Sequence, residues 1–334
     1  MKPIGLLIIS FTLHVCVSAQ ELAKYNQNQK NMNSIIKVAA AQIAPVFLDK
    51  QKTVEKACKS IEEAAKNGAK LIVFPEGFIP GYPDWVWLIP NSKGGELNEL
   101  FVELVENSIS VPDNSTDLLC RAAKENSINV VIGMNERNTE SSNSSIFNSM
   151  LFIDDQGKII GKHRKLIPTG GERLVWAQGD GTDLTSYQTS AGKVGGLICW
   201  ENYMPLARTA MYESGMQILA APTWDKSPNW QNSVQHIARE GGVFVISVCM
   251  AFSMDDLPDK YEFKKLYPEG RTWINQGNSI IVGPNGKILA GPLEEEEGIL
   301  YADLDLKDII AAKRMFDAVG HYSRPDVFHF EVKE

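Results

Sequence analysis

The chain has 334 residues, of which 44% are hydrophobic and 22% are charged, a composition that is typical of a globular protein with a large core. Its formal net charge of -8 argues against a nucleic-acid-binding groove, because such a groove needs clustered basic side chains to neutralise phosphates. We therefore expect a small-molecule partner and no nucleic acid.

Residues 1–19 are predicted to form a secretory signal peptide. A basic residue precedes an apolar stretch over residues 4–17, and a cleavage site of small residues ends at Ala19. The stretch is too short to span a bilayer of about 30 Å comfortably, so we expect no stable membrane insertion. The mature protein would then be secreted or periplasmic, with residues 20–34 as a polar spacer.

Strands and helices alternate from residue 35 onward. The pattern predicts a strand at 35–43, a helix at 53–67 and a buried strand at 70–75. The same order returns downstream, with helices at 117–126, 204–213 and 230–240 and strands at 129–134, 193–198, 217–221 and 243–250. Such alternation is typical of the α/β class.

Two hairpins of similar design, at residues 149–161 and 278–291, interrupt this alternation. Each has an apolar strand, a turn that ends in Gly-Lys, and a second apolar strand closed by glycine. Glycine turns are common, so coincidence is one interpretation. The other is two similar half-domains, packed as two sheets back to back with helices outside. Because no linker composition divides the body, we expect one domain over residues 35–310 and a C-terminal segment over 311–334.

The cysteines and histidines indicate neither a metal site nor a disulfide scaffold. The chain holds five of each, and their spacing is not typical of zinc ligands. The cysteines that follow the predicted signal peptide are too sparse to cross-link a fold of this size. We expect no metal and no other cofactor.

Cys199 ends an apolar run over residues 194–198, and a polar segment follows it at once. A buried strand that delivers a thiol at its tip suits nucleophilic attack. An inert core cysteine is the alternative, because free cysteines are often buried and behave as small hydrophobic residues. An ordinary thiol is mostly protonated at neutral pH, so a reactive one needs a base or a cation nearby.

Three charged residues can supply that neighbourhood. Glu76 follows the strand at 70–75 and opens a loop of prolines and glycines, and catalytic groups collect at such strand ends. Lys165 and Glu172 follow the first hairpin. A lysine near a developing anion stabilises the charge, and a carboxylate can hold the lysine in place. Taken singly, each residue can also be an ordinary solvated loop residue.

Together these segments resemble the nitrilase branch of the carbon–nitrogen hydrolase family. The resemblance runs from about residue 36 to residue 327, and its motifs are residues 74–83, 163–169, 179–181, 199–208 and 320–327. It implies that Cys199 is the nucleophile, Glu76 the general base, Lys165 the cationic stabiliser and proton donor, and Glu172 the second carboxylate that orients the substrate or the lysine. It also implies a four-layer α-β-β-α sandwich.

Members of this family pair into homodimers or larger homo-oligomers. The resemblance therefore implies an interface at the helices of residues 208–213 and 229–240, although the same apolar spacing also suits helices that only cover a core. It further implies that residues 311–334 pack on a neighbouring subunit or exchange with it.

The residues around the catalytic positions resemble those of nitrilases more than those of amidases. We therefore expect hydrolysis of an organic nitrile to a carboxylic acid and ammonia through a thioimidate and a thioester on Cys199. An amidase or a cyanide-degrading hydrolase of the same family is the alternative. A catalytically inactive secreted binding protein is a remote alternative, because all four catalytic residues are present.

Several aromatic residues near the motifs can line a substrate pocket or belong to the core, namely Tyr82, Trp85, Trp87, Trp176, Trp200 and Trp224. We expect Tyr82, Trp200 and Trp224 to bind substrate.

Overall fold

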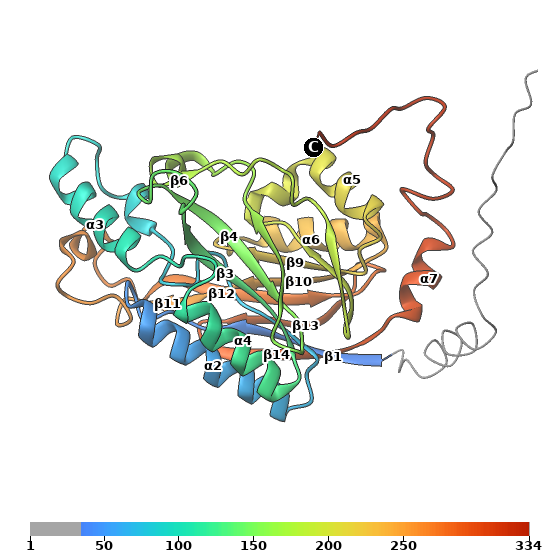
Figure 1. Cartoon of the computed structure of the whole chain (residues 1–334), viewed down its shortest axis with the longest axis horizontal. Coiled ribbons are helices and arrows are strands. Elements are labelled where there is room, and N and C mark those ends of the chain that lie inside the picture. Colours follow the sequence, from blue (N-terminus) through green and yellow to red (C-terminus); the bar gives the residue numbers. More distant parts are fainter. Residues whose placement is uncertain (1–34, 334) are drawn as a thin grey trace, which may run out of the picture. The chain divides into compact units, whose positions relative to one another are not determined.

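The computed structural model describes residues 35–333 (Figure 1). The predicted signal peptide at 1–19 and the spacer at 20–34 lie outside the described residues, so both stay predictions. Within the described part, no helix has the length and apolar character needed to cross a bilayer.

Two seven-stranded mixed sheets form the middle of the fold. The first has the order β14-β1-β2-β3-β4-β5, with β6 beside β4. Its strands are β1 (Ile35–Gln42), β2 (Leu71–Val73), β3 (Asn129–Arg137), β4 (Ile146–Ile153), β5 (Ile159–Arg164), β6 (Trp176–Ala177) and β14 (Gly298–Asp305). The second has the order β11-β12-β10-β9-β8-β7, with β13 beside β12. Its strands are β7 (Ser186–Thr189), β8 (Gly192–Gly196), β9 (Ile218–Thr223), β10 (Phe244–Cys249), β11 (Ala251–Ser253), β12 (Trp273–Val282) and β13 (Ile288–Glu294).

The two sheets share one plan. In each, three parallel strands lie side by side, β1-β2-β3 in the first and β8-β9-β10 in the second. A hairpin then adds to the last of them in antiparallel register, β4-β5 to β3 and β12-β13 to β10. These are the two hairpins of the sequence, so their similarity reflects equivalent places in two similar halves.

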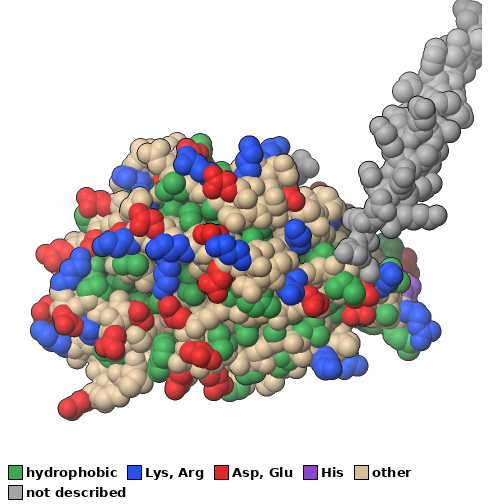
Figure 2. Space-filling view, turned by 90° about the horizontal axis from the view of Figure 1, so that it is seen from below, with side chains coloured by type: hydrophobic (Ala, Val, Ile, Leu, Met, Phe, Trp, Pro, Cys, Tyr) green, Lys and Arg blue, Asp and Glu red, His purple; other side chains and the backbone are tan. Residues whose placement is uncertain are grey.

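Two pairs of helices cover the outer faces of the sheets. α2 (Lys50–Lys66) and α4 (Asn114–Asn126) lie on the first sheet, and α5 (Pro205–Glu213) and α6 (Pro228–Gly241) on the second (Figure 1). Figure 2 shows the face on which α2 and α4 lie, where acidic and basic side chains are intermixed. The other helices of residues 35–333 are α3 (Gly94–Glu106), α7 (Lys307–Lys313) and the 3-10 turns η1 (Asp84–Trp87), η2 (Gly170–Leu174), η3 (Cys199–Tyr203) and η4 (Glu262–Leu266).

Side-chain alternation along the strands builds the layers. Successive side chains of a strand point to opposite faces. In β1, Ala39 and Ala41 therefore pack under α2 and α4, whereas Val38 and Ala40 pack between the two sheets. The predicted four-layer α-β-β-α sandwich is confirmed.

Element ends differ from the predictions for local reasons. α2 begins three residues early because the Asp49 carboxylate accepts a hydrogen bond from the backbone of Lys52 at 3.0 Å and caps the helix. α4 likewise begins at Asn114, where Asp113 and Thr116 form a capping box. The strand predicted to reach Pro75 ends at Val73, since proline has no N–H for the sheet.

The site-bearing loops leave the sheets at related edges. β5 is antiparallel to β4, which is antiparallel to β3, so β5 runs parallel to β2 and β3. Glu76, after β2, and Lys165, after β5, therefore emerge at the same edge of the first sheet. The strand predicted at 193–198 ends at Gly196, and the chain then turns so that Cys199 follows it at the edge of the second sheet.

Gly133 offers a test of how tightly the Glu76 loop is held. A Cβ at this position of β3 would lie 2.0 Å from the carbonyl oxygen of Pro75, and backbone cannot move aside cheaply. We expect Gly133→Ala to lower the free energy of unfolding by about 1–3 kcal/mol, measured by thermal or urea unfolding. The matched control is Gly95→Ala in α3, where a Cβ would meet nothing within 4 Å and alanine favours the helix. Equal stability of Gly133→Ala and the wild type would contradict the expectation.

Candidate active site

Lys165 lies between two carboxylates at the core of the site. Its Nζ is 2.8 Å from Oε1 of Glu76 and 2.7 Å from Oε2 of Glu172, and all three side chains are buried. Burial alone would lower the pKa of Lys165, but the carboxylates of Glu76 and Glu172 raise it above the ordinary lysine value. The ammonium is therefore kept, and it can stabilise an anion or donate a proton beside it.

Glu76 has one occupied and one open oxygen. Oε1 accepts hydrogen bonds from Lys165 and from the side-chain amide of Asn148, at 2.8 and 2.7 Å. Oε2 is buried and has no hydrogen-bond partner among the described residues. Burial raises the pKa of Glu76, and the Lys165 ammonium opposes the rise. A buried carboxylate oxygen without a partner is costly, and this one is free to take a proton from a thiol or from water.

Glu172 is held on both oxygens. Oε2 also accepts from the backbone N–H of Thr169 at 2.7 Å, where the chain enters η2. Oε1 accepts from the hydroxyl of Tyr82 at 2.7 Å. These contacts fix the carboxylate, which suits a residue that orients Lys165 and Tyr82.

Cys199 occupies a sharp turn. Its φ is +52°, a left-handed backbone conformation that residues other than glycine seldom adopt. The side-chain amide of Asn202 holds the turn by donating to the carbonyls of Leu197 and Cys199, at 2.8 and 2.9 Å. The hydroxyl of Thr223, at the end of β9, donates to the sulfur at 3.1 Å.

The sulfur of Cys199 carries its proton at rest. Burial raises the pKa of the Cys199 thiol to about 12, Glu76 adds to the rise, and Lys165 opposes it. A thiol with this pKa must lose its proton as it attacks. Glu76, whose charge acts on the sulfur, is the base available to take it.

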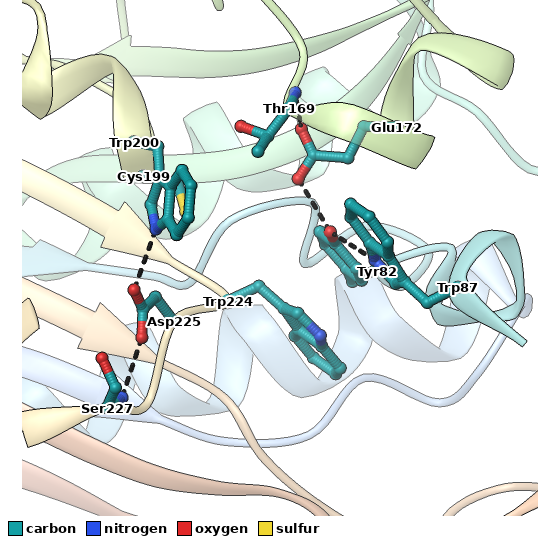
Figure 3. Close-up of a pocket in the computed structure, with 9 residues that line it drawn as sticks. All are labelled: Tyr82, Trp87, Thr169, Glu172, Cys199, Trp200, Trp224, Asp225 and Ser227. Carbon is teal, nitrogen blue, oxygen red and sulfur yellow. Dashed lines mark hydrogen bonds between the residues drawn. The ribbon is translucent and has the colours of Figure 1, made fainter.

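A cavity of about 370 Å³ opens onto the sulfur (Figure 3). Its lining is Tyr82, Trp87, Thr169, Glu172, Cys199, Trp200, Trp224, Asp225 and Ser227. The rings of Tyr82 and Trp224 stack with centroids 4.4 Å apart and planes 7° apart. The indole N–H of Trp200 donates to Asp225 at 2.8 Å, and that of Trp87 donates to the Tyr82 hydroxyl at 3.2 Å. The walls are therefore aromatic and held in position, with room for a substrate of one or two small rings.

The structure divides the aromatic residues singled out in the sequence. Tyr82, Trp200 and Trp224 lie at the cavity together with Trp87. The other two do not line it: Trp85 and Trp176 are buried in the core. Trp176 donates its indole N–H to Asn135 at 2.7 Å and packs edge-on against Tyr82, so it supports the cavity wall from behind.

The sequence analysis did not single out four residues of the site, namely Asn148, Thr223, Asp225 and Ser227. Thr223 and Asp225 lie at and just beyond the end of β9, a strand that was predicted to stop at residue 221. Polar residues at the ends of parallel strands collect at one edge of a sheet, so the positions of Thr223 and Asp225 could have been predicted on this ground. Asn148 lies inside β4 among apolar residues, and nothing in its local sequence distinguishes it.

Residues 37–314 match the family model described as "Carbon-nitrogen hydrolase". The chain belongs to the carbon–nitrogen hydrolase family. It is 43% identical to Nitrilase 2 of Arabidopsis thaliana, over 90% of each chain. It is 42% identical to an aliphatic nitrilase of Sinorhizobium fredii (strain HH103), over 89% of this chain and 96% of the relative. The predicted family resemblance is confirmed.

Solved structures agree on the fold. The crystal structure of a carbon–nitrogen hydrolase from Helicobacter pylori G27 matches with a TM-score of 0.68 at 23% identity, over 89% of this chain and 98% of that one. An amidase from Nesterenkonia sp. matches with a TM-score of 0.61 at 19% identity, over 82% and 92%. At these identities the likeness concerns the arrangement of the chain alone.

The protonation state of Cys199 can be tested by alkylation. Only the thiolate reacts with iodoacetamide. Because burial raises the pKa of the Cys199 thiol to about 12, the fraction of thiolate increases with pH throughout the neutral range. We expect the rate of iodoacetamide addition to Cys199 to increase about tenfold per pH unit between about pH 7 and pH 9, followed by peptide mass spectrometry. Cys58, half-buried on α2, is an internal reference in the same digest. A plateau below pH 8 would show that the thiolate is already formed at rest.

Proposed function

We propose that this protein is a nitrilase that hydrolyses an organic nitrile to a carboxylic acid and ammonia. The observation that carries the proposal is a buried lysine held between two carboxylates beside a cysteine that opens onto an aromatic cavity. The 42–43% identity to nitrilases over about nine-tenths of the chain supports the same chemistry.

The first half of the reaction forms a thioimidate. The sulfur of Cys199 bonds to the nitrile carbon while Glu76 takes the thiol proton. Lys165 donates a proton to the nitrile nitrogen, whose negative charge it also stabilises. The 2.8 Å hydrogen bond between the two side chains then lets the proton pass from Glu76 back to Lys165. The sum of these transfers is addition of S–H across the carbon–nitrogen triple bond.

The second half releases ammonia and then the acid. Glu76 takes a proton from water as the oxygen adds to the thioimidate carbon, which gives a tetrahedral intermediate. Lys165 protonates the nitrogen to an amine, and Glu76 returns the water proton to Lys165 through their hydrogen bond. The hydroxyl of the intermediate then gives its proton to Glu76 while Lys165 protonates the amine, so the carbon–nitrogen bond breaks, ammonia leaves and a thioester remains on Cys199. The same hydrogen bond again returns the proton from Glu76 to Lys165. A second water, again activated by Glu76, releases the acid and regenerates the thiol. If the tetrahedral intermediate expels the sulfur in place of ammonia, the product is the amide.

Amidases and cyanide-degrading enzymes of the family are the other candidates, since the four polar residues serve all three reactions. The cavity favours an organic nitrile over cyanide, because its aromatic walls enclose about 370 Å³ that a two-atom substrate would leave unfilled. The sequence relatives favour nitriles over amides, because they are named nitrilases.

A substrate panel tests the proposal. Ammonia release is measured with aryl, arylacetyl and aliphatic nitriles, with cyanide and with the matched amides. We expect organic nitriles to be the best substrates, Cys199→Ala to be inactive, and Glu76→Gln to lose about 10²–10⁴ in kcat. Cys58→Ala is the matched cysteine control and should retain activity. Faster turnover of amides than of every nitrile would overturn the assignment, and so would a preference for cyanide.

The same proposal includes a homo-oligomer. The C-terminal segment beyond α7 exposes large apolar side chains, namely Met315 (69% exposed), Tyr322 (58%), Val327 (56%) and Phe328 (72%). Leu206 on α5 is 68% exposed. Apolar side chains gathered on a short segment favour burial against another surface. We propose that this surface belongs to a second copy of the chain, which contacts the C-terminal segment and the layer formed by α5 and α6.

Light scattering coupled to size exclusion tests the assembly. We expect the full chain to be a dimer or larger, and a chain ending at Gly320 to shift towards the monomer because it loses most of this apolar surface. Phe328→Ala should weaken association less than the truncation does. A full chain that is monomeric at micromolar concentration would contradict the proposed assembly.

A further inference from the structure

A second buried charge cluster, made of His163, Asp183 and Glu201, lies behind the reacting residues. His163 is on β5, two residues before Lys165, and is 2% exposed. Its Nδ1 is 2.7 Å from a carboxylate oxygen of Asp183, and its Nε2 is 2.8 Å from one of Glu201. Because ionised carboxylates only accept hydrogen bonds, both ring nitrogens must donate, and the ring is an imidazolium.

The charge on the ring persists at neutral pH. Burial alone would lower the pKa of His163, but the carboxylates of Glu201 and Asp183 raise it to about 10. The cluster is therefore a cation between two anions, in the same arrangement as Lys165 between Glu76 and Glu172.

Glu201 joins the two reacting segments directly. It lies two residues after Cys199, and its carboxylate accepts from the backbone N–H of Ile198 and of Leu166, each at 2.8 Å. Ile198 precedes the nucleophile and Leu166 follows Lys165. One buried carboxylate thus holds the chain on both sides of the site, from the second sheet and from the first.

Asp183 holds the same segment from another side. Its second oxygen accepts from the backbone N–H of Arg164 at 2.9 Å, so the residue just before Lys165 is also held. Apolar packing between the sheets is non-directional, whereas hydrogen bonds to charged groups are short and directional. The cluster can therefore set the separation of Lys165 and Cys199 in a way that the hydrophobic core does not.

We propose that His163, Asp183 and Glu201 form a positioning clasp that holds Lys165 at the correct distance from Cys199 without touching the substrate. The inference rests on the proposed nitrilase function for one of its readouts. Its distinctive consequence lies in the fate of the tetrahedral intermediate. Loss of ammonia needs a proton from Lys165, whereas loss of the sulfur does not, so a displaced Lys165 shifts the products from acid towards amide.

The main variant is Glu201→Gln. Glutamine has nearly the shape of glutamate, but its side-chain NH2 group would face N–H groups that also donate hydrogen bonds. Asp183→Asn is a milder variant, because its amide oxygen can still accept from the ring, and it serves if Glu201→Gln does not fold. Glu103→Gln is the matched control, since Glu103 is a carboxylate paired with Lys260 and Tyr261 away from the site.

We expect Glu201→Gln to lower kcat per folded enzyme by about 10–100-fold, to change KM by less than about twofold, and to raise the amide fraction of the product severalfold. Asp183→Asn should lie between this variant and the wild type, and Glu103→Gln should match the wild type. A merely structural role would reduce the amount of folded enzyme and leave the acid-to-amide ratio unchanged. An unchanged ratio in both clasp variants therefore overturns the proposal.

A readout without turnover separates this proposal from the proposed function. If the wild type turned over no nitrile, the function would fail, and the clasp would be judged by iodoacetamide addition to Cys199. We expect addition to be severalfold faster in Glu201→Gln, because the turn that buries the sulfur loses the acceptor of the Ile198 N–H. Equal rates in the variant and the wild type would overturn the clasp.

Discussion

The site depends on one constraint, an ammonium kept inside the protein between two carboxylates. Lys165, Glu76 and Glu172 are all removed from water, and each charge would be strongly unfavourable there without the others. Two carboxylates against one ammonium leave an excess of negative charge. That excess helps to explain why the neighbouring thiol keeps its proton until a substrate arrives. The carboxylates that stabilise the buried lysine therefore also keep the thiol protonated until a substrate arrives.

Much of this arrangement could be predicted from the sequence. Alternating strand and helix patterns indicated an α/β fold, and the repeated hairpin indicated two equivalent sheets. Glu76, Lys165 and Cys199 each follow closely after a strand and lie inside a motif of the family, whereas Glu172 lies on η2, beyond the motif that contains Lys165. These signals are local, so they can be read before the chain is folded.

Other parts of the site follow from packing and could not be predicted in this way. Asn148 contacts Glu76 only because β4 passes behind the loop that follows β2. Trp85 and Trp87 are two residues apart on a 3-10 turn, yet one is buried in the core and the other borders the cavity. His163 and Glu201 belong to two separate motifs, one on β5 of the first sheet and one just after β8 of the second, and they come into contact only when the two sheets pack together.

The left-handed backbone at Cys199 has a consequence for how this position can change. For a side chain other than glycine, that conformation is unfavourable by on the order of 1 kcal/mol. Glycine, or to a lesser degree asparagine, would relax the turn, yet neither supplies a sulfur. Stability and reactivity thus select different residues at one position, so a search for more thermostable sequences would favour replacing the nucleophile.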